Sequence, residues 1–141
     1  MADLQIVRGD SYALRRPLYT HLLTNANGTP FDLTGCTVRT TFKTETTDPN
    51  SDTTDSTAVI KGTLIVNGSG TATTETKMYM VGAATAGEVE LRLSASDTLA
   101  LATGTQWSSD VELTDGNGEV FTWVFTDKLS TIDGYTNRTS G

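Results

Sequence analysis

The chain has little of what small proteins use for covalent staples or for catalysis. Among its 141 residues there are one Cys, one His and three Pro. A single Cys cannot form a disulfide within the chain, and neither a nucleophile–base pair nor a zinc site can be built from Cys36 and His21 alone. We therefore expect Cys36 to pack as a small hydrophobe, His21 to be a structural or surface imidazole, and the chain not to be an enzyme.

Cationic residues and long hydrophobic runs are also scarce. Lys and Arg number 10 against 17 Asp and Glu, for a formal net charge of −7. Phosphate binding needs clustered Lys and Arg, so nucleic acid and anionic membranes are not expected partners. No stretch approaches the roughly 20 apolar residues of a membrane helix. No Gly-rich phosphate loop precedes a helix either, so we expect no cofactor and no small-molecule substrate.

The composition that remains favours strands and turns. Runs rich in Ala, Leu, Glu and Lys are missing, whereas Thr and Gly are plentiful. The length fits a single domain over residues 1–141. Short segments of alternating hydrophobicity, separated by turn residues, predict an all-β sandwich of about seven or eight antiparallel strands. Two segments differ: residues 96–101 predict one short helical turn, and residues 45–57, which hold three Asp and nothing apolar, predict a long acidic surface loop.

Residues 105–126 predict a β-hairpin around which the sandwich is organised. The first arm alternates between apolar and polar residues, which is typical of a half-buried strand. The second arm is apolar on both faces. The Asp-Gly-Asn-Gly sequence at residues 115–118 offers two Gly and one Asn for the positive-φ positions of a tight turn. The two arms should therefore be antiparallel neighbours.

The alternation also separates core residues from surface residues. Val120 and Val124 lie on the face of the second arm opposite its aromatic residues, so something must cover them. The cover is either residues 71–81 folding back or another subunit, which makes Val120 and Val124 candidate interaction residues. The predicted core residues share the inward face of their strands: Val38, Phe42, Leu91, Trp107, Val111, Leu113, Phe121, Trp123 and Phe125.

Acidic residues suggest two kinds of site that we weigh against plain surface. Asp48, Asn50 and Asp52 match the opening of a calcium loop, and they are weak metal candidates. Thr53 and Val59 stand where such a loop needs a turn Gly and a bidentate Glu, so we expect a solvated loop and no bound metal. A glycosidase would need a facing pair of carboxylates. The strand carboxylates alternate with buried residues, which is typical of the solvent side of a sheet: Glu88, Glu90, Asp110 and Glu112.

Three segments carry a resemblance to a known family. They are residues 32–38 (DLTGCTV), 93–101 (LSASDTLAL) and 110–115 (DVELTD), followed by Gly118 and Thr122. In this order they resemble the immunoglobulin-like N-terminal domain of bacteriophage baseplate upper proteins and small virion proteins related to it. The resemblance spans residues 9–132 and implies an immunoglobulin-like sandwich. It also implies a structural protein of the tail or baseplate that packs against copies of itself and other virion proteins, and a location in the virion after assembly in the host cytoplasm.

Two alternatives to a tail or baseplate protein remain open. One is a capsid decoration protein on the head surface. The other is a carbohydrate-binding or adhesion module, in which exposed rings of Tyr12, Tyr19, Trp107 and Trp123 would form a platform for a sugar. Alternation places both tryptophans on inward faces, which favours a scaffold over a sugar-binding platform.

Overall fold

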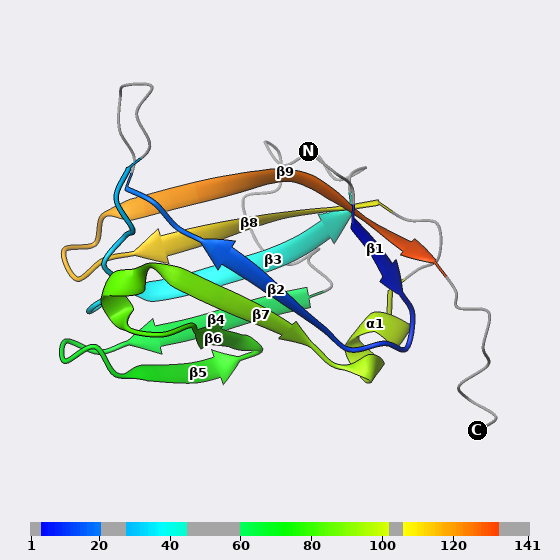
Figure 1. The fold of residues 1–141 in the computed structure, drawn as a ribbon, viewed down its shortest axis with the longest axis horizontal. Coiled ribbons are helices and arrows are strands. Elements are labelled where there is room, and N and C mark those ends of the chain that lie inside the picture. The colour runs from blue at the N-terminus through cyan, green and yellow to red at the C-terminus, as the bar shows by residue number, and fades with distance from the viewer. Residues whose placement is uncertain (1–3, 21–27, 45–59, 102–105, 133–141) are drawn as a thin grey trace.

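A computed structural model describes residues 4–20, 28–44, 60–101 and 106–132. These residues form a six-stranded sheet in the order β1-β9-β8-β3-β4-β5 and a three-stranded sheet in the order β2-β7-β6, and the two sheets lie face to face (Figure 1). The prediction of an all-β sandwich is confirmed, with more strands than the predicted seven or eight. The strands are β1 (Leu4–Val7), β2 (Tyr12–Pro17), β3 (Thr37–Thr44), β4 (Ile60–Val66), β5 (Ala72–Thr76), β6 (Met78–Met80), β7 (Glu88–Leu93), β8 (Gln106–Thr114) and β9 (Val120–Ile132).

The predicted hairpin is the pair β8–β9, in which Thr114 lies opposite Val120 and Val111 opposite Trp123. In the turn, the Asp115 carboxylate accepts hydrogen bonds from the backbone N–H groups of Asn117 and Glu119, both at 2.9 Å. Gly118 has a positive φ of 82°, whereas Gly116 and Asn117 do not have positive φ values. The turn therefore needs one left-handed residue where the sequence suggested three, because the Asp115 side chain organises the rest.

All other strand pairs in the described residues are antiparallel except one. β1 runs parallel to β9, with Leu4 opposite Leu129 and Val7 opposite Ile132. β1 and β2 are consecutive in the chain but belong to different sheets. The N-terminal segment therefore crosses from one layer of the sandwich to the other.

Residues 71–81 also cross between the layers. β5 pairs with β4 in the large sheet and β6 pairs with β7 in the small one. Lys77 joins them with a φ of 55°, which is unusual for a residue other than Gly. This segment closes the side of the sandwich formed by β4, away from β9. It does not cover Val120, which remains 56% exposed, so the expectation that this segment folds back over Val120 is wrong.

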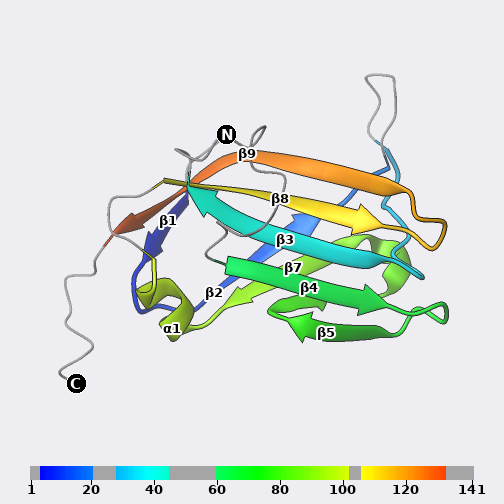
Figure 2. The same ribbon diagram turned by 180° about the vertical axis from the view of Figure 1, so that it is seen from behind.

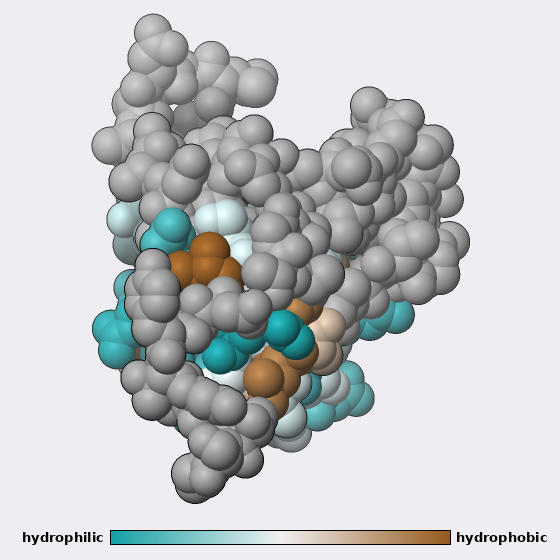
Figure 3. All heavy atoms as spheres, turned by 90° about the vertical axis from the view of Figure 1, so that its right-hand side faces the viewer, coloured by the Kyte–Doolittle hydropathy of each residue, from teal (hydrophilic) through white to brown (hydrophobic). Residues whose placement is uncertain are grey.

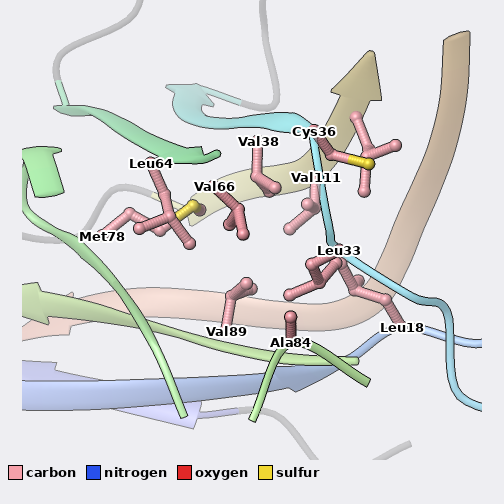
Figure 4. Packing of buried hydrophobic residues seen from close by; sticks show 11 residues of the cluster. Leu18, Leu33, Cys36, Val38, Leu64, Val66, Met78, Ala84, Val89 and Val111 are labelled. Carbon is pink, nitrogen blue, oxygen red and sulfur yellow. The ribbon is translucent and has the colours of Figure 1, made fainter. Parts of the chain in front are cut away.

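The core between the sheets consists of two hydrophobic clusters. At Gly62 the layers approach so closely that an added Cβ would lie 2.9 Å from Leu91 Cδ1 of the small sheet, and it would also lie 3.1 Å from Thr40 Cγ2 on the neighbouring strand β3. The first cluster contains Leu18, Leu33, Cys36, Val38, Leu64, Val66, Met78, Ala84, Val89, Val111 and Leu113 (Figure 4). The second contains Ile6, Phe42, Ile60, Leu91, Leu93, Leu101 and Trp107.

The structure places most of the predicted core residues between the sheets. Six are buried: Val38, Phe42, Leu91, Trp107, Val111 and Leu113. Phe121 and Trp123 are only half-buried, and the side chain of Phe125 lies outside the described ones. Phe121 and Trp123 are less enclosed than the other six because of what covers this part of β9. Phe31 packs edge-on against Phe121 at 5.0 Å and against Trp123 at 5.5 Å between ring centroids, in place of a strand of the small sheet.

The helical turn predicted over 96–101 is α1 (Ala95–Leu99), one residue earlier at its start. Ser94 caps it: the Ser94 Oγ accepts from the Asp97 N–H at 3.2 Å, and the Asp97 carboxylate accepts from the Ser94 N–H at 2.8 Å. Leu101 then enters the core while Leu99 stays 45% exposed. Figure 3 views the end of the sandwich that carries α1 and β1, where hydrophobic and hydrophilic side chains of the described residues are interspersed.

β2 ends at Pro17, on an edge of the small sheet. The Leu18 N–H then donates to the Gly87 carbonyl at 2.7 Å, and the Phe31 N–H donates to the Leu18 carbonyl at 2.9 Å. Gly87 ends the short 3-10 turn η1 (Ala84–Ala86) with a φ of 63°. A Cβ there would lie 2.7 Å from the Phe31 backbone, so this crossing of three backbone segments requires glycine.

Candidate functional site

The candidate metal ligands and nucleophiles do not form a site in the described residues. Asp48, Asn50, Asp52 and His21 lie outside those residues, so the predictions for them stay predictions. Elsewhere in the described part of the chain, no group of His, Cys, Asp and Glu could hold a metal ion. Cys36 is buried, and its burial, with the nearby carboxylates of Asp115 and Asp32, raises the pKa of the thiol. A protonated, enclosed thiol is a poor nucleophile, which fits a packing role.

The four strand carboxylates lie on opposite outer surfaces of the sandwich. Glu88 and Glu90 are on β7 in the small sheet, whereas Asp110 and Glu112 are on β8 in the large one. The core lies between the two pairs. The fold therefore does not set a carboxylate of β7 across a cleft from a carboxylate of β8, as glycoside hydrolysis would require.

Glu90 is not the solvated residue that alternation predicts. It is buried on the outer surface of the small sheet, where Arg15 Nε lies 3.3 Å from its Oε2 and Arg92 Nε lies 2.8 Å from its Oε1. The Arg92 guanidinium also sits 3.9 Å above the centre of the Tyr79 ring. The hydrogen bond from Arg92, with the positive charges of Arg92 and Arg15, lowers the pKa of Glu90 despite its burial. The arginines thus cover the carboxylate and hold three strands together.

Cross-strand register explains this cluster. Arg15 on β2 lies opposite Glu90 on β7, and Glu90 lies opposite Tyr79 on β6. The sequence shows the charges on each strand but not which strands are neighbours. Alternation alone therefore could not find the cluster, and its satisfied contacts indicate a structural role.

The aromatic residues considered for a sugar platform are mostly engaged in the fold. Tyr12 accepts a hydrogen bond from the Val7 N–H at 2.8 Å, and the Trp107 indole donates to Thr131 Oγ1 at 2.6 Å from a buried position. The Trp123 indole donates to the Tyr19 carbonyl at 2.9 Å. Of these four residues, Tyr19 is the one classed as exposed, at 47%. The four rings are therefore not arranged as a flat exposed platform.

The outer face of the six-stranded sheet is the strongest candidate for a functional surface among the described residues. Figure 2 looks onto this face, with the small sheet behind it. Two of the large hydrophobic residues classed as exposed lie here: Val120 on β9, at 56%, and Ile65 on β4, at 38%. Val124, the other predicted interaction residue, has a side chain outside the described ones.

The register aligns the residues of this face in rows that cross four strands. Across β9, β8, β3 and β4, the row nearest the β8–β9 turn has apolar residues at its ends and hydroxyls at its centre: Val120, Thr114, Thr37 and Ile65. On β5 this row continues to Thr73. The second row has opposite charges at its centre: Thr122, Glu112, Arg39 and Thr63. Charged residues are depleted at the centre of protein interfaces, and the first row carries none.

Comparison with known proteins assigns no family: no family model matches the chain, and no curated protein is significantly similar to it. The helices found in the described ranges are all too short or too polar to cross a membrane. The face of the large sheet therefore stands on its own geometry as the candidate site.

Proposed function

We propose that this protein is a structural virion protein of a tailed bacteriophage. It serves as an immunoglobulin-like assembly module of the tail or baseplate that packs against copies of itself and neighbouring virion proteins. The observation that carries the proposal is the outer face of the large sheet, where Val120 is 56% exposed beside the strands β8, β3 and β4. Isolated exposed hydrophobic residues are common on protein surfaces, so it is the broad sheet face as a whole, with Val120 and Ile65 on it, that fits packing against a neighbour.

The resemblance to phage baseplate proteins supports the same function. Its three segments lie at structural positions: residues 32–38 lead into β3, residues 93–101 hold the capped helix α1, and residues 110–115 end β8. These segments build the sandwich, and a family defined by them is defined by its scaffold. In the family that the chain resembles, this scaffold serves as an assembly module, and the resemblance supports the same role here.

The proposal is tested by locating the chain in purified phage particles. Mass spectrometry of particles should detect the chain in multiple copies, and immunogold labelling should place it on the tail or baseplate. Label on the head surface would make it a capsid decoration protein instead. Absence of the chain from purified particles would overturn the virion function.

A further inference from the structure

We infer that the outer face of the six-stranded sheet is a two-fold docking surface for a second copy of this chain. In this arrangement β3 of one copy lies over β8 of the other, and the symmetry axis runs along the strands above the line between β3 and β8. The inference rests on the proposed function, because it names the partner and the surface used in assembly.

In the first row, the same kinds of residue follow each other outward on both sides of the line between β3 and β8. Thr114 and Thr37 are adjacent on either side of that line, while Val120 and Ile65 lie one strand further out on each side. A rotation about the proposed axis puts β9 of one copy over β4 of the other. Val120 then meets the partner's Ile65 at both ends of the row, so these exposed hydrophobic residues bury each other.

The second row is self-complementary in charge. Glu112 and Arg39 are opposite each other across the β3–β8 line, and both are exposed. The same rotation sets Glu112 of one copy over the partner's Arg39, and Arg39 over the partner's Glu112. An isologous interface forms every such contact twice, so a single residue pair supplies two ion pairs.

The charge of the whole chain makes this balance informative. With a formal charge of −7, two copies repel each other at most surfaces. Among the described side chains on the outward faces of β8, β3 and β4, two cations balance two carboxylates, and Glu75 on the edge strand β5 adds one further carboxylate. The balancing groups are Arg39, Lys61, Asp110 and Glu112. Juxtaposing this face with itself pairs opposite charges instead of accumulating negative ones.

The size of the surface sets the expected strength. Four or five strands spaced about 4.8 Å apart, over six residues rising about 3.3 Å each, span on the order of 400–500 Å² per copy. Stable complexes bury about 800 Å² per partner. The contact should therefore be weak between two isolated copies and become effective when many copies are held in one particle.

Charge-reversal variants distinguish an ion pair between Arg39 of one copy and Glu112 of the other from an ion pair between the same two residues within one sheet. Sedimentation velocity of the full chain should show a monomer–dimer equilibrium that shifts to dimer as concentration rises. Arg39→Glu alone and Glu112→Arg alone should each weaken the dimer at least tenfold, since each places like charges opposite one another twice. An equimolar mixture of the two variants should restore a heterodimer at wild-type strength, because both cross-copy pairs become complementary again.

Net charge cannot produce this pattern. Arg39→Glu changes the chain from −7 by −2 to −9, and Glu112→Arg changes it by +2 to −5. General repulsion predicts that the second variant dimerises more strongly, whereas the proposed pairing predicts that it dimerises less. Circular dichroism should show that both exposed substitutions leave the fold intact, with only a small fall in melting temperature from the like charges that each places side by side within its own sheet.

The apolar row has its own test and a matched control. Val120→Asp and Ile65→Asp should each abolish the dimer, whereas Leu99→Asp should not, because Leu99 is similarly exposed at 45% but lies on α1 away from this face. A wild-type chain that stays monomeric at millimolar concentration would overturn the inference. So would single charge variants that dimerise like the wild type, or a mixture that stays monomeric.

These results are distinguishable from failure of the virion function. If the chain is found in particles but the mixture does not restore the dimer, the assembly function stands and this docking surface is wrong. If the chain is absent from particles yet the mixture restores the dimer, the surface stands and the virion function is wrong.

Discussion

Individual residues contribute to this fold according to their enclosure more than their size, and the two tryptophans show it. Trp107 is 2% exposed, and its indole N–H donates to Thr131 Oγ1, itself fully buried, at 2.6 Å. Trp123 is half-buried under Phe31. We therefore expect the tryptophan on β8 to contribute more to the stability of the fold than the tryptophan on β9.

We predict that Trp107→Ala destabilises the protein by about 3–5 kcal/mol, because it leaves a large cavity and removes the partner of Thr131. Trp123→Ala should cost clearly less, because solvent already reaches that ring. Urea denaturation followed by circular dichroism measures both. A Trp123→Ala variant that loses as much stability as Trp107→Ala would contradict the difference in enclosure.

At this scale the sequence predicts burial well and partners poorly. Alternation on β3 and β8 identifies Val38, Phe42, Val111 and Leu113 as inward, because period-two patterning is a local property of a strand. Glu90 has the same local pattern as a solvated residue. Its enclosure comes from Arg15 on a strand about 75 residues away in sequence, and that neighbour is set by topology rather than by local pattern.

Glu90 gives a pH-dependent prediction. Its folded pKa is lowered, chiefly by the hydrogen bond from Arg92, below the ordinary value of 4.5. A group with a depressed folded pKa stabilises the fold above its unfolded pKa, and this contribution is lost as the pH falls through the folded pKa. The stability gap between wild type and Glu90→Gln should therefore be largest near neutral pH and narrow below 4.5. Urea midpoints across this range measure the gap, and a constant gap would show that Arg92 and Arg15 do not stabilise the carboxylate.

At the scale of elements, short connections decide how the two layers are joined. Lys77 turns the chain from the large sheet into the small one, and its Nζ pairs with Asp97 of the helix cap at 2.9 Å. The sequence of residues 71–81 shows an ordinary polar strand followed by a short apolar run. It does not show the switch of sheets, because a positive φ at a Lys carries no sequence signal.

The short helix α1 is an element that the sequence does predict, and the structure identifies Ser94 as its cap. Ser94→Ala should cost about 1 kcal/mol, because the Asp97 N–H loses its acceptor at the first turn of α1. Ser96→Ala is the matched control, since the described contact of its hydroxyl is with Ser94 Oγ at 3.1 Å on the exposed side. Thermal unfolding measures both variants. Equal losses for the two would show that the cap does not stabilise the helix.

A comparison of Gly87 with Gly118 distinguishes the cost of a steric clash from the cost of a left-handed backbone conformation. Gly87→Ala introduces a Cβ 2.7 Å from the backbone of Phe31 at a φ of 63°, whereas Gly118 has a φ of 82° and nothing within 4 Å. Gly118→Ala should cost about 1–2 kcal/mol from the left-handed conformation alone. Gly87→Ala should cost substantially more and reduce soluble expression, because backbone cannot move aside as a flexible side chain can. Similar chemical-denaturation curves for the two variants would contradict the close approach.

At the scale of the whole molecule, the two outer surfaces differ in a way that fits one free side and one docking side. The small sheet carries a charge-balanced cluster in which Arg15 and Arg92 pair with Glu88 and Glu90. The large sheet carries exposed Val120 and Ile65 with hydroxyls between them. Composition indicates an acidic chain and hydropathy indicates a sandwich. The identity of the docking face follows from strand order and register, which the sequence alone does not determine.

Because of the net charge, we expect self-association to strengthen as salt is added. At a separation of about 30 Å, two copies carrying −7 would repel by roughly 7 kcal/mol in water without salt. Salt at about 0.15 M screens most of this repulsion, because the Debye length falls to about 8 Å. Exposed ion pairs such as those between Arg39 and Glu112 contribute only about 0.2–1 kcal/mol each. Added salt therefore removes less attraction than repulsion.

We therefore predict that the dimer tightens as salt rises from about 10 mM to about 150 mM. Sedimentation velocity at fixed protein concentration measures the change, and Val120→Asp serves as the control that should stay monomeric throughout. The Glu112→Arg and Arg39→Glu mixture should follow the wild-type curve, since its mean charge is also −7. A dimer that weakens steadily with salt over this range would mean that ion pairs, rather than the apolar ends of the first row, dominate the contact between copies.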